Sequence, residues 1–151
     1  MIVGNMGSAN LFDYTVIGNA VNTGARLEPL NKDFGTVAMV SGVTRREAEE
    51  HAPGEFLFRT IPPVAVKGRT TGLEVSELVG FSRKVPEAKK KVIAIFERGI
   101  LQLREGKRAG AEASLREALV LDPSDGPSET WLKLLPELPP DWDGIYIQKT
   151  K

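Results

Sequence analysis

The stretch that decides the fold is VGNMGSANLFDYTVIGNAVNTGARLE, which occupies residues 3–28. Its two apolar runs flank a connection rich in glycine and asparagine, a pattern typical of a β-hairpin. Gly18 then ends the second strand, and Asn19 is a favourable N-cap for a helix that extends to about Asn31. The opening of the chain therefore predicts a hairpin followed directly by a helix.

Outward from this stretch, short apolar runs alternate with turn residues. Ser41 is positioned to cap a helix over residues 44–51, with His51 at its end. Apolar or alternating segments predict strands at residues 36–40, 56–61, 63–66 and 73–79. The order hairpin, helix, strand, helix, strands predicts an α+β fold with helices on one side of the sheet.

From residue 86 onward, helix-forming residues dominate. Two amphipathic helices are expected at 86–103 and 109–121, and a third at 128–135. The spacing of the first two matches one tetratricopeptide-type helical hairpin. Since about three such repeats make a free-standing array, we expect this hairpin to pack on the sheet, on a partner or on a second copy. The residues at the small, apolar and terminating positions of that repeat are Gly99, Gly106, Ala111, Leu115, Ala118 and Pro123.

Asn22 and Arg26 lie four residues apart, so their side chains share one face of the expected helix. A guanidinium is planar, permanently charged and forked, which suits it to phosphate. An amide beside it can orient a ribose or a phosphate oxygen. A solvated helix face explains the same spacing, and the spacing does not decide between the two interpretations.

The hairpin and helix together resemble the catalytic domain of class III adenylate/guanylate cyclases. The resemblance rests on residues 3–8, 13–22 and 25–28, and a weaker match continues from Val66 to Leu78. It implies the C-terminal half of a ferredoxin-like cyclase sheet, with the helical hairpin appended. The implied domains are a cyclase half at 1–82, a tetratricopeptide-like region at 83–138 and an extended tail at 139–151.

By this resemblance, the chain is a fragment of a parent enzyme that makes cyclic AMP and pyrophosphate from ATP at a site formed between two cyclase domains. The resemblance implies that Asn22 and Arg26 stabilise the transition state. It also implies that Thr15 contacts the adenine, as in adenylate-type members, and that Lys67 binds the nucleotide phosphates. Gly24 and Asn19 depart from the family's usual alanine and aspartate.

The family's Mg²⁺ or Mn²⁺ ions are held by two aspartates that precede the region matched here. Within the cyclase-like region, Asp13 and Asp33 match neither metal position. We therefore expect the metal ligands to lie outside this chain, in the parent enzyme, whose two cyclase domains would come together as a homodimer. We also expect the chain to be a truncated part of a parent enzyme and to be inactive alone.

Composition narrows the other possibilities. Twenty basic residues balance twenty acidic ones, and cysteine is absent. This composition predicts neither nucleic-acid binding nor thiolate chemistry, and with the absence of a long apolar run it favours a cytoplasmic protein without a membrane segment. The basic cluster at 83–91 is interpreted as a solvated face, the Gly4–Ser8 loop lacks a P-loop pattern, and Trp131 and Trp142 are expected to be packing anchors.

Two functions remain open at this stage. The first is a cyclase fragment that supplies the transition-state residues. The second is a non-catalytic interaction module in which the degenerate cyclase half and the helical hairpin bind a partner.

Overall fold

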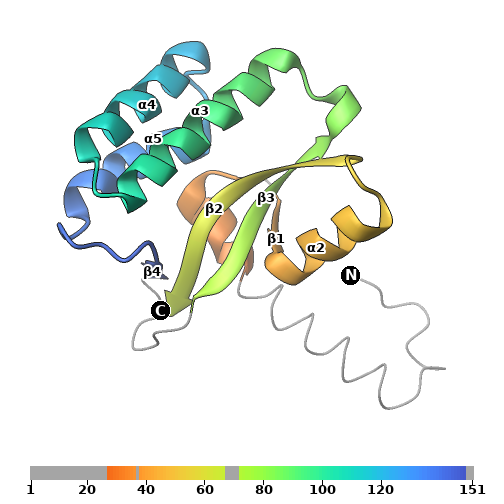
Figure 1. The fold of residues 1–151 in the computed structure, drawn as a ribbon, viewed down its shortest axis with the longest axis horizontal. Helices are drawn as coiled ribbons and strands as arrows, with labels where there is room; N and C mark the ends of the chain where they lie inside the picture. Colours follow the sequence, from red (N-terminus) through yellow and green to blue (C-terminus); the bar gives the residue numbers. More distant parts are fainter. Residues whose placement is uncertain (1–26, 37, 67–71, 149–151) are drawn as a thin grey trace.

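Figure 1 shows the chain as a computed structural model, which describes residues 27–36, 38–66 and 72–148. Within these ranges, four strands form one sheet in the order β1-β3-β2-β4. β3 is antiparallel to both β1 and β2, whereas β4 is parallel to β2. The strands are β1 (Met39–Ser41), β2 (Phe56–Val66), β3 (Leu73–Phe81) and β4 (Tyr146–Gln148).

The helices follow the sequence expectations closely. Residues 27–34 are helical. Ser41 caps α2 as predicted, because its hydroxyl accepts a hydrogen bond from the Thr44 amide at 3.2 Å. The remaining helices are α2 (Gly42–His51), α3 (Glu87–Arg104), α4 (Arg108–Leu121) and α5 (Gly126–Leu134), with 3₁₀ turns η2 (Ser82–Lys84) and η3 (Leu135–Glu137).

The predicted α+β fold is therefore confirmed, and two of the predicted strands and the tail differ in detail. The two expected strand pieces at 56–61 and 63–66 form one strand, β2, whose register slips between Ile61 and Val64. Pro62 and Pro63 occupy this slip, since a proline has no N–H to donate to the ladder. The tail, which was expected to be extended, adds β4 to the sheet beside β2.

Helices cover both faces of the sheet, and not one face as the sequence predicted. Successive strand residues point to opposite faces. On one face, Arg59 of β2 meets Asp125, which precedes α5, and the ring of Phe96 in α3. On the other face, Arg45 of α2 donates to Thr60 at 3.1 Å and to Ser76 at 2.9 Å. In Figure 1 the helices α3, α4 and α5 group together, away from α2.

The helices α3 and α4 pack as an antiparallel pair. Arg98 bonds Glu117 at 2.6 Å, while Gln102, one turn further along α3, lies against Gly110 and Ser114 of α4. A side chain on Gly99 would come within 3.1 Å of Ser114, so this glycine permits the close approach. The helices are confirmed, and the likeness of the pair to a tetratricopeptide repeat stays a prediction.

One hydrophobic core lies between the sheet and the helices α3, α4 and α5. The segment 27–34 also contributes to this core, and Trp131 at its centre is fully buried. The predicted boundary between residues 82 and 83 therefore runs through a shared core. Its members include Leu27, Leu30, Phe34, Met39, Ile61, Val64, Val75, Phe96, Ile100, Leu103, Ala111, Leu115, Trp131, Leu135 and Tyr146.

Candidate functional site

The four predicted site residues, Thr15, Asn22, Arg26 and Lys67, lie outside the described residues, and their roles stay predictions. The structure does describe the chain beside two of them. Leu27, the residue after Arg26, is helical and buried. Val66, the residue before Lys67, ends β2.

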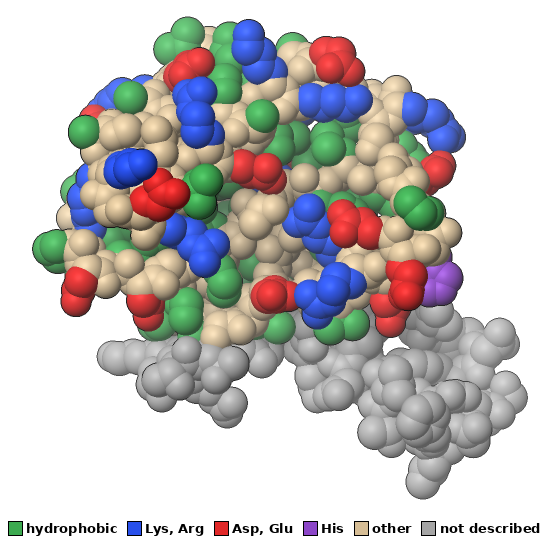
Figure 2. Space-filling view, viewed as in Figure 1, with side chains coloured by type: hydrophobic (Ala, Val, Ile, Leu, Met, Phe, Trp, Pro, Cys, Tyr) green, Lys and Arg blue, Asp and Glu red, His purple; other side chains and the backbone are tan. Residues whose placement is uncertain are grey.

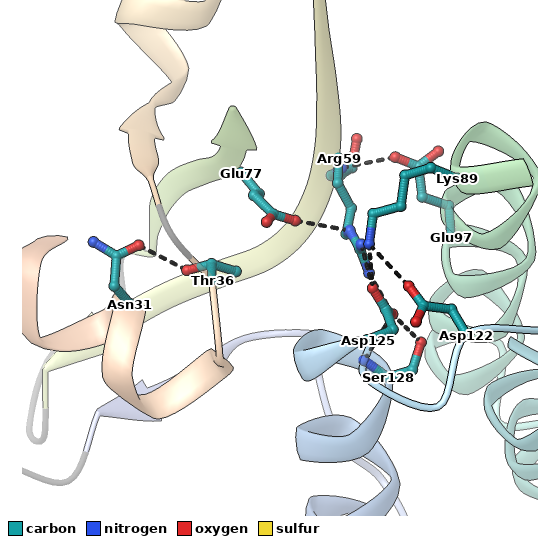
Figure 3. Close-up of polar contacts among 10 residues, drawn as sticks. Asn31, Thr36, Arg59, Glu77, Lys89, Glu97, Asp122, Asp125 and Ser128 are labelled. Carbon is teal, nitrogen blue, oxygen red and sulfur yellow. Dashed lines mark hydrogen bonds and ion pairs between the residues drawn. The ribbon is translucent and has the colours of Figure 1, made fainter. Parts of the chain in front are cut away.

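A buried polar network is the densest cluster of charge in the described part of the chain (Figure 3). Arg59 and Asp125 are both fully buried and form a two-pronged pair, with Nη1 donating to Oδ2 at 2.9 Å and Nη2 to Oδ1 at 2.7 Å. Lys89 of α3 donates to Asp125 at 3.0 Å and to Asp122 at 3.4 Å. Ser128 donates to Asp125 from its hydroxyl at 2.5 Å and from its amide at 3.3 Å, so Asp125 also caps α5.

Glu77 of β3 completes this network. Its Oε1 lies 2.9 Å from Arg59 Nε, an ion-pair distance, although the N–H is not aligned for a hydrogen bond. Burial raises the pKa of the Glu77 carboxyl, and Arg59 and Lys89 oppose that rise. Burial acts the same way on Asp125, but hydrogen bonds from Arg59 and Ser128 outweigh it and hold the pKa of Asp125 well below its ordinary value.

The network therefore sets two cations, Arg59 and Lys89, against three carboxylates, Glu77, Asp122 and Asp125. The ring of Phe96 covers the Arg59 guanidinium, with the Cζ atom 4.9 Å from the ring centroid. The Arg59–Asp125 pair is closed to solvent, so it acts as an internal anchor between β2 and the start of α5. The Arg59–Asp125 pair was not predicted from the sequence. Its one sequence signal is the lone arginine in the apolar run of β2, since a buried charge needs a partner.

An open cleft lies on the opposite face of the sheet, between α2 and the strands β2 and β3, with a volume of about 380 Å³. Arg45 is held there by Thr60, Ser76 and Glu49, and stacks on Phe58 with its Cζ 5.1 Å from the ring centroid. The charges of this cleft are thus largely paired within the chain. Its polar lining consists of Arg45, Arg46, Glu49, Thr60, Glu74, Ser76 and Arg104. Figure 2 shows basic and acidic side chains interspersed over this side of the molecule.

No three histidine, aspartate or glutamate side chains among the described residues come together as a metal site. The acidic groups of the buried network are occupied by Arg59, Lys89 and Ser128. The described residues therefore do not fit the Mg²⁺ or Mn²⁺ that the cyclase resemblance implies.

This geometry defines an α+β chain whose sheet and helical tail share one core. Comparison with known proteins shows that it contains a region related to adenylate cyclases. Over 84 residues the chain is 36% identical to adenylate cyclase 1 of Rhizobium meliloti (strain 1021), a match that covers 56% of this chain and 12% of that protein.

Two further relatives are also named adenylate cyclases. Over 100 residues the chain is 28% identical to the terminal-differentiation specific adenylate cyclase of Dictyostelium discoideum, covering 66% of this chain and 5% of that one. Over 79 residues it is 32% identical to an adenylate cyclase of Anabaena cylindrica, covering 52% and 15%. The chain thus spans between 5% and 15% of the length of these curated relatives.

No family model matches the chain. No solved structure matches it significantly. In the part of the chain that the structure describes, no helix combines the length and the apolarity that crossing a bilayer requires.

Proposed function

We propose that this chain supplies one half of a class III adenylate cyclase site, which converts ATP to cyclic AMP and pyrophosphate. The observation that carries the proposal is the match to three adenylate cyclases, of which the first covers 56% of the chain. The resemblance of residues 3–28 to class III cyclases supports the roles proposed for Thr15, Asn22 and Arg26, and the weaker match from Val66 to Leu78 supports the role proposed for Lys67.

The reaction joins the ribose 3′-oxygen to the α-phosphorus and breaks the bond between that phosphorus and the oxygen that leaves with pyrophosphate. Negative charge grows on the phosphoryl oxygens during this exchange. Arg26 and Asn22 would stabilise that charge in the transition state, and Lys67 would bind the phosphates. Thr15 would contact the adenine. The aspartates of the second cyclase domain would hold the Mg²⁺ or Mn²⁺, which would supply a Lewis acid to the site.

The proposal keeps the division into a cyclase half (1–82), a helical region (83–138) and a tail (139–151), and it places the enzyme in the cytoplasm as a homodimer. The competing proposal is an interaction module without catalysis. It is supported by the lack of a metal-ligand cluster among the described residues. However, the helices α3, α4 and α5 bury apolar side chains against the chain's own sheet, which reduces the apolar surface left for a partner.

A complementation assay separates the two. The full chain is mixed with a bacterial adenylate cyclase domain that retains its metal-binding aspartates but carries alanine at its own Asn/Arg pair. We expect cyclic AMP from the mixture with Mg²⁺ or Mn²⁺, and none from this chain alone. Asn22→Ala and Arg26→Ala should each lower kcat by about 100-fold with little change in KM, because their interactions form in the transition state.

Arg116→Ala is the matched control, since Arg116 is a surface arginine of α4 paired with Glu112. It should leave turnover unchanged. Association of the two proteins is followed by size-exclusion chromatography in the same samples. A mixture that makes no cyclic AMP, with or without association, contradicts the proposed function. Cyclic AMP from the chain alone contradicts the missing metal half.

A further inference from the structure

An apolar groove lies between β4 and the segment that follows α5. It has a volume of about 540 Å³, and residues 137–139 and 141–143 line it together with residues 145–147. Its apolar lining includes Leu134, Leu138, Trp142 and Ile145. Trp142 and Ile145 are only half-buried, so this apolar surface is open to a ligand. We call it the β4 groove.

Hydrogen bonds hold the walls of the β4 groove in place. Arg108 of α4 reaches across to donate to the carbonyl oxygen of Leu138 at 2.6 Å. On the other side, the Trp142 indole N–H donates to Ile145 O at 2.9 Å, and the Ile145 amide donates to Asp143 Oδ1 at 3.0 Å. The groove is therefore formed before any ligand enters, as most binding sites are.

The charge lining the β4 groove has one sign. Glu137, Asp141 and Asp143 line it, and no lysine or arginine does. Neither Asp141 nor Asp143 forms an ion pair with a residue that the structure describes. In the cleft beside α2, by contrast, both glutamates are paired with arginines. Arg104, which lies near Gly144, lines that cleft and not this groove.

β4 also offers the edge of a sheet beside the groove. It is the last strand in the order β1-β3-β2-β4, so among the described strands only β2 pairs with it. An edge strand presents unpaired N–H and C=O groups to an incoming segment. Ile147, in the middle of β4, lines the groove and is 44% exposed. An extended segment can add to such an edge through main-chain hydrogen bonds and place alternate side chains in the pocket beside it.

We propose that the β4 groove is a docking site for an extended segment of a partner protein in which basic and apolar residues alternate. The segment adds to the edge of β4. Its apolar side chains contact Trp142 and Ile147, and its long basic side chains reach Asp141 and Asp143 at the rim. A metal ion is a poor occupant, because the acidic side chains of the described residues do not converge as a metal site. This inference goes beyond the proposed function and does not depend on it.

The probe is a short fluorescein-labelled peptide of alternating valine and lysine. A matched peptide has glutamate in place of lysine. Fluorescence anisotropy of each peptide is titrated with the full chain at low and at physiological salt. We expect the lysine peptide to bind, more weakly as salt screens the charges, and the glutamate peptide not to bind. Amide hydrogen exchange should show slower exchange in residues 145–148 when the lysine peptide is bound.

The test variant is the double change Asp141→Asn, Asp143→Asn. Asparagine keeps an Oδ1 that can accept the Ile145 amide, so the turn before β4 is retained. Since an exposed ion pair contributes up to about 1 kcal/mol, losing two should weaken binding of the lysine peptide about tenfold. The matched control is Glu112→Gln, Glu117→Gln, which removes two exposed acidic groups of α4 and should leave binding unchanged.

Ile147→Lys is a second variant, which tests the edge of β4 and serves alone if the double variant fails to fold. It puts a positive charge on the exposed side chain of β4 and should abolish binding of the lysine peptide. Two other occupants are tested in parallel. Lys149→Ser, Lys151→Ser removes the basic residues that follow β4 in the sequence, and size-exclusion chromatography follows self-association.

The outcomes separate cleanly. Binding that falls in both groove variants and not in the α4 control supports the inference. No binding of the lysine peptide overturns it, as does equal binding of the glutamate peptide or binding that neither groove variant weakens. Binding that appears only after Lys149→Ser, Lys151→Ser overturns it in favour of the chain's own tail. Self-association that Ile147→Lys abolishes overturns it in favour of a second copy.

Discussion

Replacing Asp125 by Asn tests the Arg59–Asp125 anchor between β2 and α5. The change removes the negative charge opposite Arg59 and keeps a side chain of nearly the same shape. Because asparagine caps helices about as well as aspartate, the cap of α5 is retained. The measured effect therefore reports the loss of the buried negative charge that faces Arg59 and Lys89, and not the helix end.

The size of the effect follows from the burial of the pair. Removing one member of a buried ion pair costs about 3–5 kcal/mol, because the other charge stays buried without compensation. Here Glu77 at 2.9 Å and the Phe96 ring at 4.9 Å still partly compensate Arg59. We therefore expect the lower end of that range, about 3 kcal/mol, which is a large share of the roughly 5–15 kcal/mol typical of a folded domain.

Urea unfolding followed by circular dichroism and tryptophan fluorescence measures this loss. The matched control is Glu74→Gln, another carboxylate-to-amide change, in a pair with Arg46. That pair has an N–O distance of 2.6 Å, close to the 2.7 Å of the buried pair, but both of its side chains are 64% exposed. Exposed pairs contribute about 0–1 kcal/mol. If Asp125→Asn costs no more than Glu74→Gln, the reasoning from burial is wrong.

The pH dependence gives a second check on the same residue. The pKa of Asp125 is lower in the folded state than in the unfolded state, where an aspartate titrates near about 3.9. Its stabilising contribution is therefore present above that unfolded pKa and is lost as the pH falls toward the folded one. The difference between wild type and Asp125→Asn should shrink as the pH is lowered below about 4. A difference that stays constant there contradicts the assignment.

Two further outcomes follow from the packing. Gly126→Ala should lower the free energy of unfolding by about 1–3 kcal/mol, because the new Cβ would collide with the backbone of Gly35. Gly110→Ala in α4 should be neutral or stabilising, because its Cβ meets only the flexible end of Gln102. Urea unfolding of both variants measures the difference. Burial, together with the nearby Asp33 and Glu137, raises the pKa of Tyr146, so wild-type stability should fall as the pH rises past about 10. Tyr146→Phe should remove part of that alkaline loss, and an unchanged alkaline profile would contradict the assignment.

Most local elements could be predicted because their signals are local. The Ser41 cap, the end of β2 near Val66 and the helices α3 and α4 each depend on residues only a few positions apart. The register slip in β2 is likewise visible from Pro62 and Pro63 in the sequence. Periodicity and capping describe such short-range preferences well.

The pairing of β4 with β2 could not be predicted, because it joins Tyr146 to Val64 across β3 and the helices α3, α4 and α5, and because β4 itself has only three residues. A strand this short carries almost no alternating pattern of its own. The sequence also did not predict that α2 lies on the opposite face of the sheet from α3 and α5. This placement depends on which side chains of β2 face which helix, and the order of elements does not settle that.

The sequence by itself determined the element types, their approximate ends and the pattern at 3–28 that leads to the proposed cyclase chemistry, since each of these is encoded in neighbouring residues. Only the tertiary structure decided that the sheet and the helices α3, α4 and α5 share one core, that Arg59 pairs with Asp125 66 residues further on, and that β4 pairs with β2 and packs against Phe34. The physical reason is burial: an unpaired charge or an uncovered apolar face is costly, but which distant group relieves that cost depends on the whole packed chain.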